Sequence, residues 1–262
     1  MPIVIEPRGR GRPPTHPVDR VRTKLWFNAV KRSSGLPSAY ALEMTFDGER
    51  VRKRETDVAR PRKWDSYEKG AVVPTDKPGP RNAVEQAEAR YPGTVRWFRS
   101  PLWALLKREE FDSRRIEDAL RTLEPEVVAV LFEAKPREHE HAPRQRSFDG
   151  EGVRQLLAIA SFDALVAAVL LAALAEVIAS PQLRERALHL YVELQAPLRD
   201  VPELAGVYPE LFSLIDQRCK HWVYLSDNQR MDVVIFWQGV QADAERRKVA
   251  DGDESRSQTE TA

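Results

Sequence analysis

The chain has 262 residues with 42% hydrophobic and 31% charged content, 19 prolines and a single cysteine. This hydrophobic content excludes a wholly disordered chain, and one cysteine excludes an internal disulfide framework or a cysteine-based metal site. The net charge of +1 hides an asymmetry, because residues 1–115 carry 25 Lys or Arg against 15 Asp or Glu, whereas the remainder carries 16 against 25.

The basic front half indicates a polyanionic partner such as nucleic acid. Two alternatives explain the same asymmetry without a partner: ion pairing between the two halves of the chain, or a merely solvated basic face. Residues 1–20, rich in arginine, glycine and proline, are expected to form a disordered basic tail. They lack the apolar stretch of a secretory signal, and together with the single cysteine this is typical of a cytoplasmic protein.

A basic domain is expected over residues 21–134, because apolar residues recur there at helical spacing between capping residues. Its first helices are predicted at residues 22–34, 37–46, 61–69 and 82–90. Asn82 is the expected cap of the last, with Glu85 as its capping-box partner. A dense apolar cluster follows at 97–106, and residues 112–134 are expected to form one or two helices with a kink near Pro125.

The rear of the chain is predicted to be an acidic helical bundle over residues 152–250, joined to the front by a linker at 135–151. Its helices are expected at 155–179, 183–194, 211–225 and 231–249, and a disordered tail at 251–262. The fold class is therefore mainly α. Such a bundle is expected to serve self-association or a protein partner.

A short helix at 61–69 carries the most informative motif. Pro61 suits its first turn, Trp64 and Tyr67 share one face, and Gly70 suits the left-handed position that ends a helix. The run from Trp64 through Tyr67, Glu68 and Gly70 to Pro74 resembles the third helix and following turn of Xre/lambda-repressor-like helix-turn-helix domains. The resemblance extends over residues 22–90, although residues 47–60 replace the family's tight turn by a longer connection.

The resemblance implies that this helix lies in the major groove of DNA, with Trp64 and Tyr67 facing the core. The outward residues would then contact bases or phosphates, since Arg and Lys pair with guanine or neutralise phosphate. They are Arg60, Arg62, Lys63, Ser66 and Lys69.

The tail contains a second motif, Arg10-Gly11-Arg12-Pro13, which resembles the core of an AT-hook. Glycine lets a backbone lie deep in the minor groove, and arginine is attracted to its negative floor. Pro14 stands where the usual basic residue would follow. Arg10 and Arg12 are therefore predicted to bind the minor groove or phosphates.

Other features indicate no chemistry. The twelve apolar residues at 164–175 are too few to span a bilayer and predict a buried central helix, whose small residues permit close packing. Two histidines within residues 138–141 have no recognisable third ligand, so neither a metal nor another cofactor is expected. No catalytic motif is present, and Cys219 and His221 would point apart on a helix.

The sequence therefore predicts a non-enzymatic, cytoplasmic protein that binds double-stranded DNA, most simply a dimeric transcriptional regulator of bacterial or phage type. The main alternative is a protein-interaction or mobile-element accessory protein without DNA affinity. A membrane-associated protein using residues 155–179, and a nuclease assembled from scattered carboxylates, are the remaining alternatives.

Overall fold

The structure is a computed structural model of the whole chain, and it describes residues 15–48, 62–79, 82–136, 143 and 145–219. Several expectations lie outside these residues, so the structure says nothing of them. They are the tail arginines Arg10 and Arg12, Arg60 before the short helix, the histidine pair within 138–141, the helix at 231–249 and the tail at 251–262.

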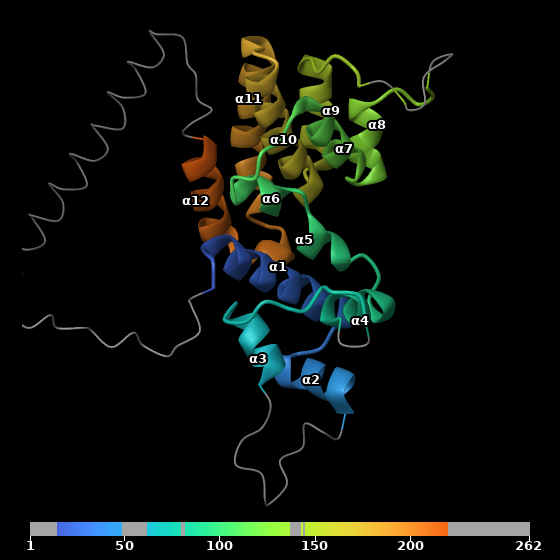
Figure 1. Cartoon of the computed structure of the whole chain (residues 1–262), viewed down its shortest axis with the longest axis vertical. Coiled ribbons are helices and arrows are strands. Elements are labelled where there is room, and N and C mark those ends of the chain that lie inside the picture. The colour runs from blue at the N-terminus through green and yellow to red at the C-terminus, as the bar shows by residue number, and fades with distance from the viewer. Residues whose placement is uncertain (1–14, 49–61, 80–81, 137–142, 144, 220–262) are drawn as a thin grey trace, which may run out of the picture. The chain divides into compact units, whose positions relative to one another are not determined.

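The fold is mainly α, as predicted (Figure 1). In the described residues the β pairing is confined to one antiparallel bridge between Phe132 and Gln145. The helices are α1 (Pro17–Ser34), α2 (Ala39–Asp47), α3 (Lys63–Glu68), α4 (Ala83–Arg90), α5 (Val95–Arg99), α6 (Leu102–Leu106), α7 (Ser113–Arg121), α8 (Pro125–Leu131), α9 (Gly150–Ile159), α10 (Phe162–Val177), α11 (Pro181–Leu198), the short 3-10 helix η2 (Pro202–Leu204) and α12 (Tyr208–Cys219).

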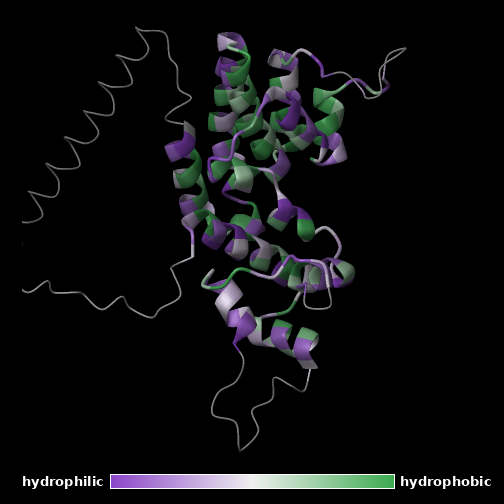
Figure 2. Cartoon of the chain, in the orientation of Figure 1, coloured by the Kyte–Doolittle hydropathy of each residue, from purple (hydrophilic) through white to green (hydrophobic). Residues whose placement is uncertain are grey.

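Helix α10 is the buried centre of the rear helices. Every residue from Phe162 to Ala175 is buried, as the apolar run predicts. α10 packs most extensively on α11 and also contacts α6, α7, α8 and α9. Figure 2 shows the hydrophobic colouring that runs along α10. Among the described residues, no helix combines the length and apolar content that crossing a membrane requires.

The single helix expected over 155–179 is two helices, α9 and α10. Ala160 adopts a left-handed conformation, with φ of 45° and ψ of 39°, and this ends α9. The Ser161 hydroxyl then accepts the Ala164 N–H and caps α10. The expectation was wrong because a continuous apolar pattern does not reveal one left-handed residue. The signal in the sequence was Ser161, because serine is a preferred N-cap residue and can mark the start of a new helix.

Capping explains most helix starts. Ser38, Asn82 and Asp112 accept backbone N–H groups at the starts of α2, α4 and α7, and Asn82 does so as predicted. Glu85 does not form the predicted capping box, because the Asn82 N–H donates to the Gly79 carbonyl at 3.0 Å and the Glu85 carboxylate lies 2.9 Å from Arg99. α1 begins five residues before the predicted start: Pro17 occupies its first turn and Val18 and Val21 are buried, so residues 17–20 belong to the helix rather than the tail.

Helices of the front and rear of the chain also contact one another, since the described residues up to Arg218 belong to one compact unit. Trp97 on α5 stacks on Phe162 of α10 with ring centroids 4.8 Å apart. Within the expected linker, Phe148 is buried and its carbonyl accepts a hydrogen bond from Arg186 on α11. The division into front and rear domains at 135–151 stays a prediction.

Candidate nucleic-acid interface

The inner face of α3 is held in an aromatic cluster. Trp64 is only 1% exposed and stacks on Phe46 of α2 and on Trp26 of α1, with centroids 4.7 Å and 5.7 Å away. Tyr67 is buried as well and meets Trp26 edge to face at 5.6 Å. The prediction that Trp64 and Tyr67 face the core is therefore confirmed. Two aromatic residues fix the orientation of a helix that has only six residues.

Burial also changes the acidity of Tyr67. Removal from water, together with the negative charge of Asp47, raises the pKa of Tyr67 to about 12. The phenol is therefore neutral throughout the physiological pH range. Tyr67 supports α3 by packing, and we assign it no acid–base role.

The N-terminal end of α3 is capped by a residue of another helix. Arg62 at the cap position offers no side-chain hydrogen bond to the helix. Instead, the fully buried Glu43 of α2 accepts the Lys63 N–H at 2.8 Å through Oε1. A carboxylate at a helix N-terminus satisfies a free donor and favours the helix dipole. Glu43 thus ties the start of α3 to α2.

The C-terminal end of α3 is fixed by Gly70 and by α1. Gly70 has φ of +64°, as a helix-ending glycine is expected to have. A Cβ atom at this position would lie 2.7 Å from the carbonyl oxygen of Arg20. Glycine is therefore required twice, for its backbone conformation and for the close approach of α1.

The outer face of α3 carries the residues predicted to bind DNA. Arg62 and Lys69 are exposed, while Lys63 and Ser66 are half-buried. The Ser66 hydroxyl donates to the Arg62 carbonyl, and the Lys63 ammonium lies 6.0 Å from the Tyr67 ring centroid. Helical periodicity places Arg62, Ser66 and Lys69 on one side. The structure thus brings together four of the seven residues predicted to bind DNA. The other three, Arg10, Arg12 and Arg60, lie outside the described residues.

The charge around α3 differs from that around α1. In the part of the chain that the structure describes, no carboxylate oxygen comes within 4.0 Å of the cationic groups of Arg62, Lys63 or Lys69. On α3 itself Glu68 reaches Lys31 of α1, at 4.0 Å. Within the described residues, no carboxylate therefore neutralises the outward cations of α3.

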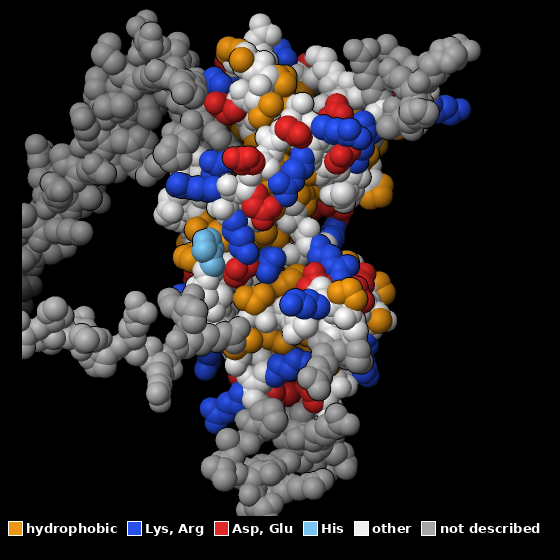
Figure 3. All heavy atoms as spheres, viewed as in Figure 1, with side chains coloured by type: hydrophobic (Ala, Val, Ile, Leu, Met, Phe, Trp, Pro, Cys, Tyr) orange, Lys and Arg blue, Asp and Glu red, His pale blue; other side chains and the backbone are white. Residues whose placement is uncertain are grey.

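By contrast, acidic residues of the rear half neutralise much of α1. Lys24 lies 2.8 Å and Arg20 3.6 Å from Glu210 at the start of α12, and Arg32 lies 3.3 Å from Glu203 in η2. Pairing between the halves, one alternative for the charge asymmetry, thus holds for these three cations. Figure 3 shows Lys and Arg interspersed with Asp and Glu on the visible face, so the basic excess is not one continuous patch there.

Thr15, which sequence reasoning did not single out, joins the start of the described chain to the end of α3. Its hydroxyl donates to the carbonyl of Ala71 at 2.9 Å. Ala71 comes two residues after Lys69. No sequence signal marks this contact, because its partners are 56 residues apart.

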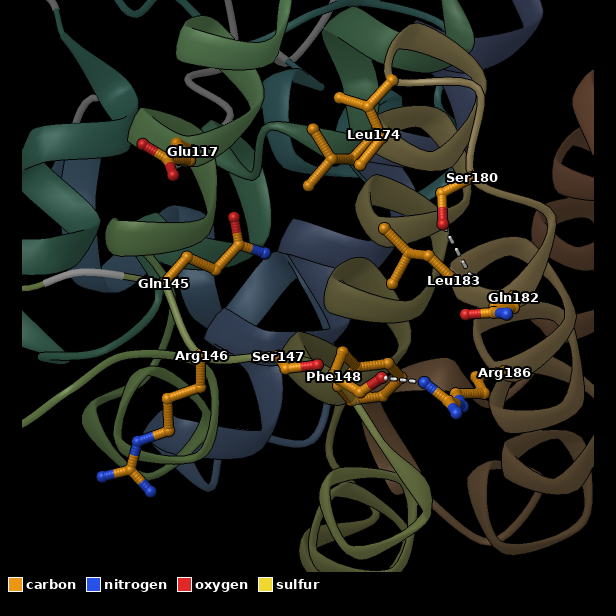
Figure 4. Close-up of a pocket in the computed structure, with 11 residues that line it drawn as sticks. Glu117, Gln145, Arg146, Ser147, Phe148, Leu174, Ser180, Gln182, Leu183 and Arg186 are labelled. Atoms are coloured by element: carbon orange, nitrogen blue, oxygen red, sulfur yellow. Dashed lines mark hydrogen bonds between the residues drawn. The ribbon is translucent and has the colours of Figure 1, made fainter.

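Helices α7, α10 and α11, together with residues 145–148, line an open cleft of about 400 Å³ (Figure 4). Its walls include Glu117 of α7, Leu174 of α10 and Leu183 of α11. The Arg186 guanidinium is directed at the Phe148 carbonyl and bonds to it at 2.8 Å, whereas the Arg146 side chain points away from the cleft. The polar groups do not converge on one point, so the cleft offers no arrangement for a defined reaction.

One buried carboxylate lies elsewhere among the rear helices. Asp163 of α10 accepts the Glu124 N–H at 2.8 Å, at the start of α8. Burial raises the pKa of Asp163, and the nearby charge of Arg96 opposes this effect. The contact joins two helices and is structural. No group of three or more metal-ligating side chains occurs among the residues described.

Comparison with known proteins gave no match to a protein-family model, to a curated protein or to a solved structure. These comparisons do not identify a helix-turn-helix domain, so the resemblance stays a prediction from the sequence.

Proposed function

We propose that this protein binds double-stranded DNA in a sequence-dependent manner and acts as a cytoplasmic transcriptional regulator, with α3 as its reading helix. The observation that carries the proposal is the two-sided character of α3. Its inner face is anchored by Trp64 and Tyr67, while its outer face presents Arg62, Lys63 and Lys69 without an acidic partner in the described residues. A rigid helix with outward cations suits recognition in the major groove.

The chemistry of the outer face fits this role. Arg62 at the start of the helix is suited to guanine O6 and N7, and Ser66 can contact either a base or a phosphate. Lys69 at the end of the helix is suited to a phosphate. With only one short helix and few cations, affinity should depend strongly on a second contact, which the tail arginines Arg10 and Arg12 and a second protomer would provide.

We propose that self-association occurs through the rear helices. Large apolar side chains are exposed there at Val177, Ile178 and Val192, which are 48%, 51% and 58% exposed. A two-fold dimer would double the contacted DNA and set the spacing between half-sites. Light scattering coupled to size-exclusion chromatography measures this directly. A monomer at all concentrations would contradict it.

The decisive experiment is enrichment and sequencing of randomised duplex DNA bound by the full chain, followed by anisotropy measurements on the selected site. Arg62→Ala combined with Lys63→Ala should weaken binding about tenfold or more without changing the melting temperature. Arg114→Ala combined with Lys135→Ala is the matched control, since it removes one exposed arginine and one exposed lysine away from α3. If no duplex binds at low salt, or if both double variants bind alike, the proposal is wrong.

A further inference from the structure

We propose that the open face of α1 is a second part of the nucleic-acid interface, which binds the sugar-phosphate backbone beside α3, and that Glu203 and Glu210 occupy this face in place of phosphate when no DNA is bound. This inference rests on the proposed function and adds to it a flanking contact and a device that regulates its strength. α3 presents few cations, and affinity for DNA depends mainly on the number of phosphates that a protein neutralises.

α1 has one open face along its middle. Of residues 23–30, all but Lys24 and Asn28 are buried. Residues four apart share one face of a helix, so Arg20 and Arg32 extend this face by one turn at each end. These four residues are called the α1 stripe below. The α1 stripe carries three cations along about 18 Å of helix.

The α1 stripe is close to the proposed reading helix. In Figure 1, α3 and α12 lie on opposite sides of α1. The end of α3 contacts α1, since Gly70 approaches the Arg20 backbone and Glu68 lies 4.0 Å from Lys31. Packed helices are about 8–10 Å apart, and the major groove is about 12 Å wide. A backbone that borders the groove occupied by α3 therefore comes within reach of the long cationic side chains of α1.

The cations of the α1 stripe already bind anionic oxygens. Lys24 lies 2.8 Å and Arg20 3.6 Å from the Glu210 carboxylate, while Arg32 lies 3.3 Å from Glu203. Two acids of the rear half thus occupy three cations of the front half. Lys and Arg bind phosphate oxygens by the same charge-assisted hydrogen bonds, so a DNA backbone can take the place of these carboxylates.

The exchange needs only the glutamate side chains to move. The backbone that carries them is fixed, because the Asn28 amide donates to the carbonyls of Glu203 and Ala205, at 2.9 Å and 3.0 Å, and Leu204 between them is buried. The Glu210 side chain, by contrast, is 38% exposed. Ion pairs near the surface contribute little to stability. Phosphates can therefore displace the carboxylates while η2 and α12 stay in place.

The two glutamates would then regulate how strongly the protein binds DNA and not which sequence it selects. They compete with the phosphates of every duplex alike, because phosphate contacts carry no sequence information. Binding to unrelated DNA is weakened, and stable binding depends more on the bases that α3 contacts.

The test uses the full chain, the site obtained by selection and an unrelated duplex. The first variant replaces the three cations of the α1 stripe by glutamine. Both duplexes should bind about tenfold more weakly or worse, and the slope of log affinity against log salt should fall by about two to three. The control variant replaces two exposed arginines and one exposed lysine elsewhere by glutamine: Arg114, Arg146 and Lys135.

A second variant is expected to gain affinity, which a loss of folding cannot imitate. Glu203→Gln combined with Glu210→Gln should bind both duplexes about threefold to tenfold more tightly and select the same bases. Its matched control is Glu185→Gln combined with Glu193→Gln, which removes two exposed carboxylates of α11.

Ethylation interference on the selected site locates the contact. Ethylation of phosphates that flank the core should weaken binding of the parent protein but not of the variant that lacks the α1 cations. Arg62→Ala combined with Lys63→Ala should leave this flanking pattern in place.

Each outcome separates this inference from the proposed function. If either variant binds like its control, or if the flanking pattern persists without the α1 cations, this inference is wrong and the proposed function stands. Binding that depends on the α1 stripe but selects no sequence overturns the sequence-dependent function and leaves the phosphate-binding face. Absence of binding to every duplex overturns both.

Discussion

Glu43 on α2 accepts the backbone N–H of Lys63 at the first residue of α3, at 2.8 Å, and its side chain is removed from water. The two residues are 20 positions apart, and the intervening chain lies largely outside the described residues. The start of the proposed reading helix is thus determined by a neighbouring helix rather than by its own sequence. Loss of this one acceptor should affect both stability and DNA binding.

The first prediction concerns this acceptor. Glu43→Ala leaves the Lys63 N–H without its partner, so the free energy of unfolding should fall by about 1–3 kcal/mol. Glu43→Gln is the matched control, because its amide oxygen still accepts a hydrogen bond. Its free energy of unfolding should fall clearly less than that of Glu43→Ala. Urea denaturation measures both. Equal losses would show that the hydrogen bond does not position α3.

The second prediction separates two requirements for glycine. Gly35 and Gly70 have nearly the same φ, +66° and +64°, but a Cβ at Gly35 meets nothing within 4 Å. Gly35→Ala should therefore lower the free energy of unfolding by about 1 kcal/mol, because alanine disfavours the left-handed conformation. Gly70→Ala should lower it by about 1–3 kcal/mol more, because the added Cβ also clashes with the Arg20 carbonyl. Thermal denaturation of both variants compares them, and equal melting temperatures would contradict the close packing of α1 on α3.

The third prediction concerns pH. Because the pKa of Asp163 is raised in the folded protein, the folded state holds this proton more tightly than the unfolded state does. Ionisation therefore lowers the free energy of unfolding as pH rises from the usual aspartate range through the raised pKa. Asp163→Asn keeps an oxygen acceptor for Glu124 and cannot ionise. Its stability relative to the parent should rise with pH across this window and then level off; a constant difference would contradict the prediction.

The fourth prediction follows from the pairs on α1. Glu210→Gln removes the carboxylate beside Lys24 and Arg20, which should raise affinity for duplex DNA of any sequence and steepen its salt dependence. Glu185→Gln, on the exposed side of α11, removes the same charge elsewhere. Anisotropy titrations over a range of salt concentrations compare the two. If both variants behave like the parent, these cations do not contribute to binding.

Local patterns predicted much of the fold. Helical spacing located most of the described helices, and short-range chemistry identified the cap Asn82 and the helix-ending Gly70. The inward faces of Trp64 and Tyr67 were also predictable, because two aromatic residues three apart on a polar helix indicate a buried side. All of these depend on residues within a few positions of each other.

The remaining features depend on contacts between distant positions. In the sequence Glu43 is an ordinary acidic residue of a helix, and Thr15 lies in a proline-rich stretch without a distinguishing neighbour. The pairing of Lys24 with Glu210 spans 186 residues, so composition suggested it only as one explanation of the charge asymmetry. The outward face of α3 could be predicted, whereas what holds it and what lies beside it required the structure.

The burial of α10 has a consequence for synthesis of the protein. Its main partner, α11, follows it in the chain, so α10 leaves the ribosome after α6, α7, α8 and α9 but before the helix that covers most of it. Until α11 is made, the apolar segment at 164–175 lacks the cover on its α11 side. A product ending before Pro181 would keep that side exposed and should aggregate or be captured by a chaperone.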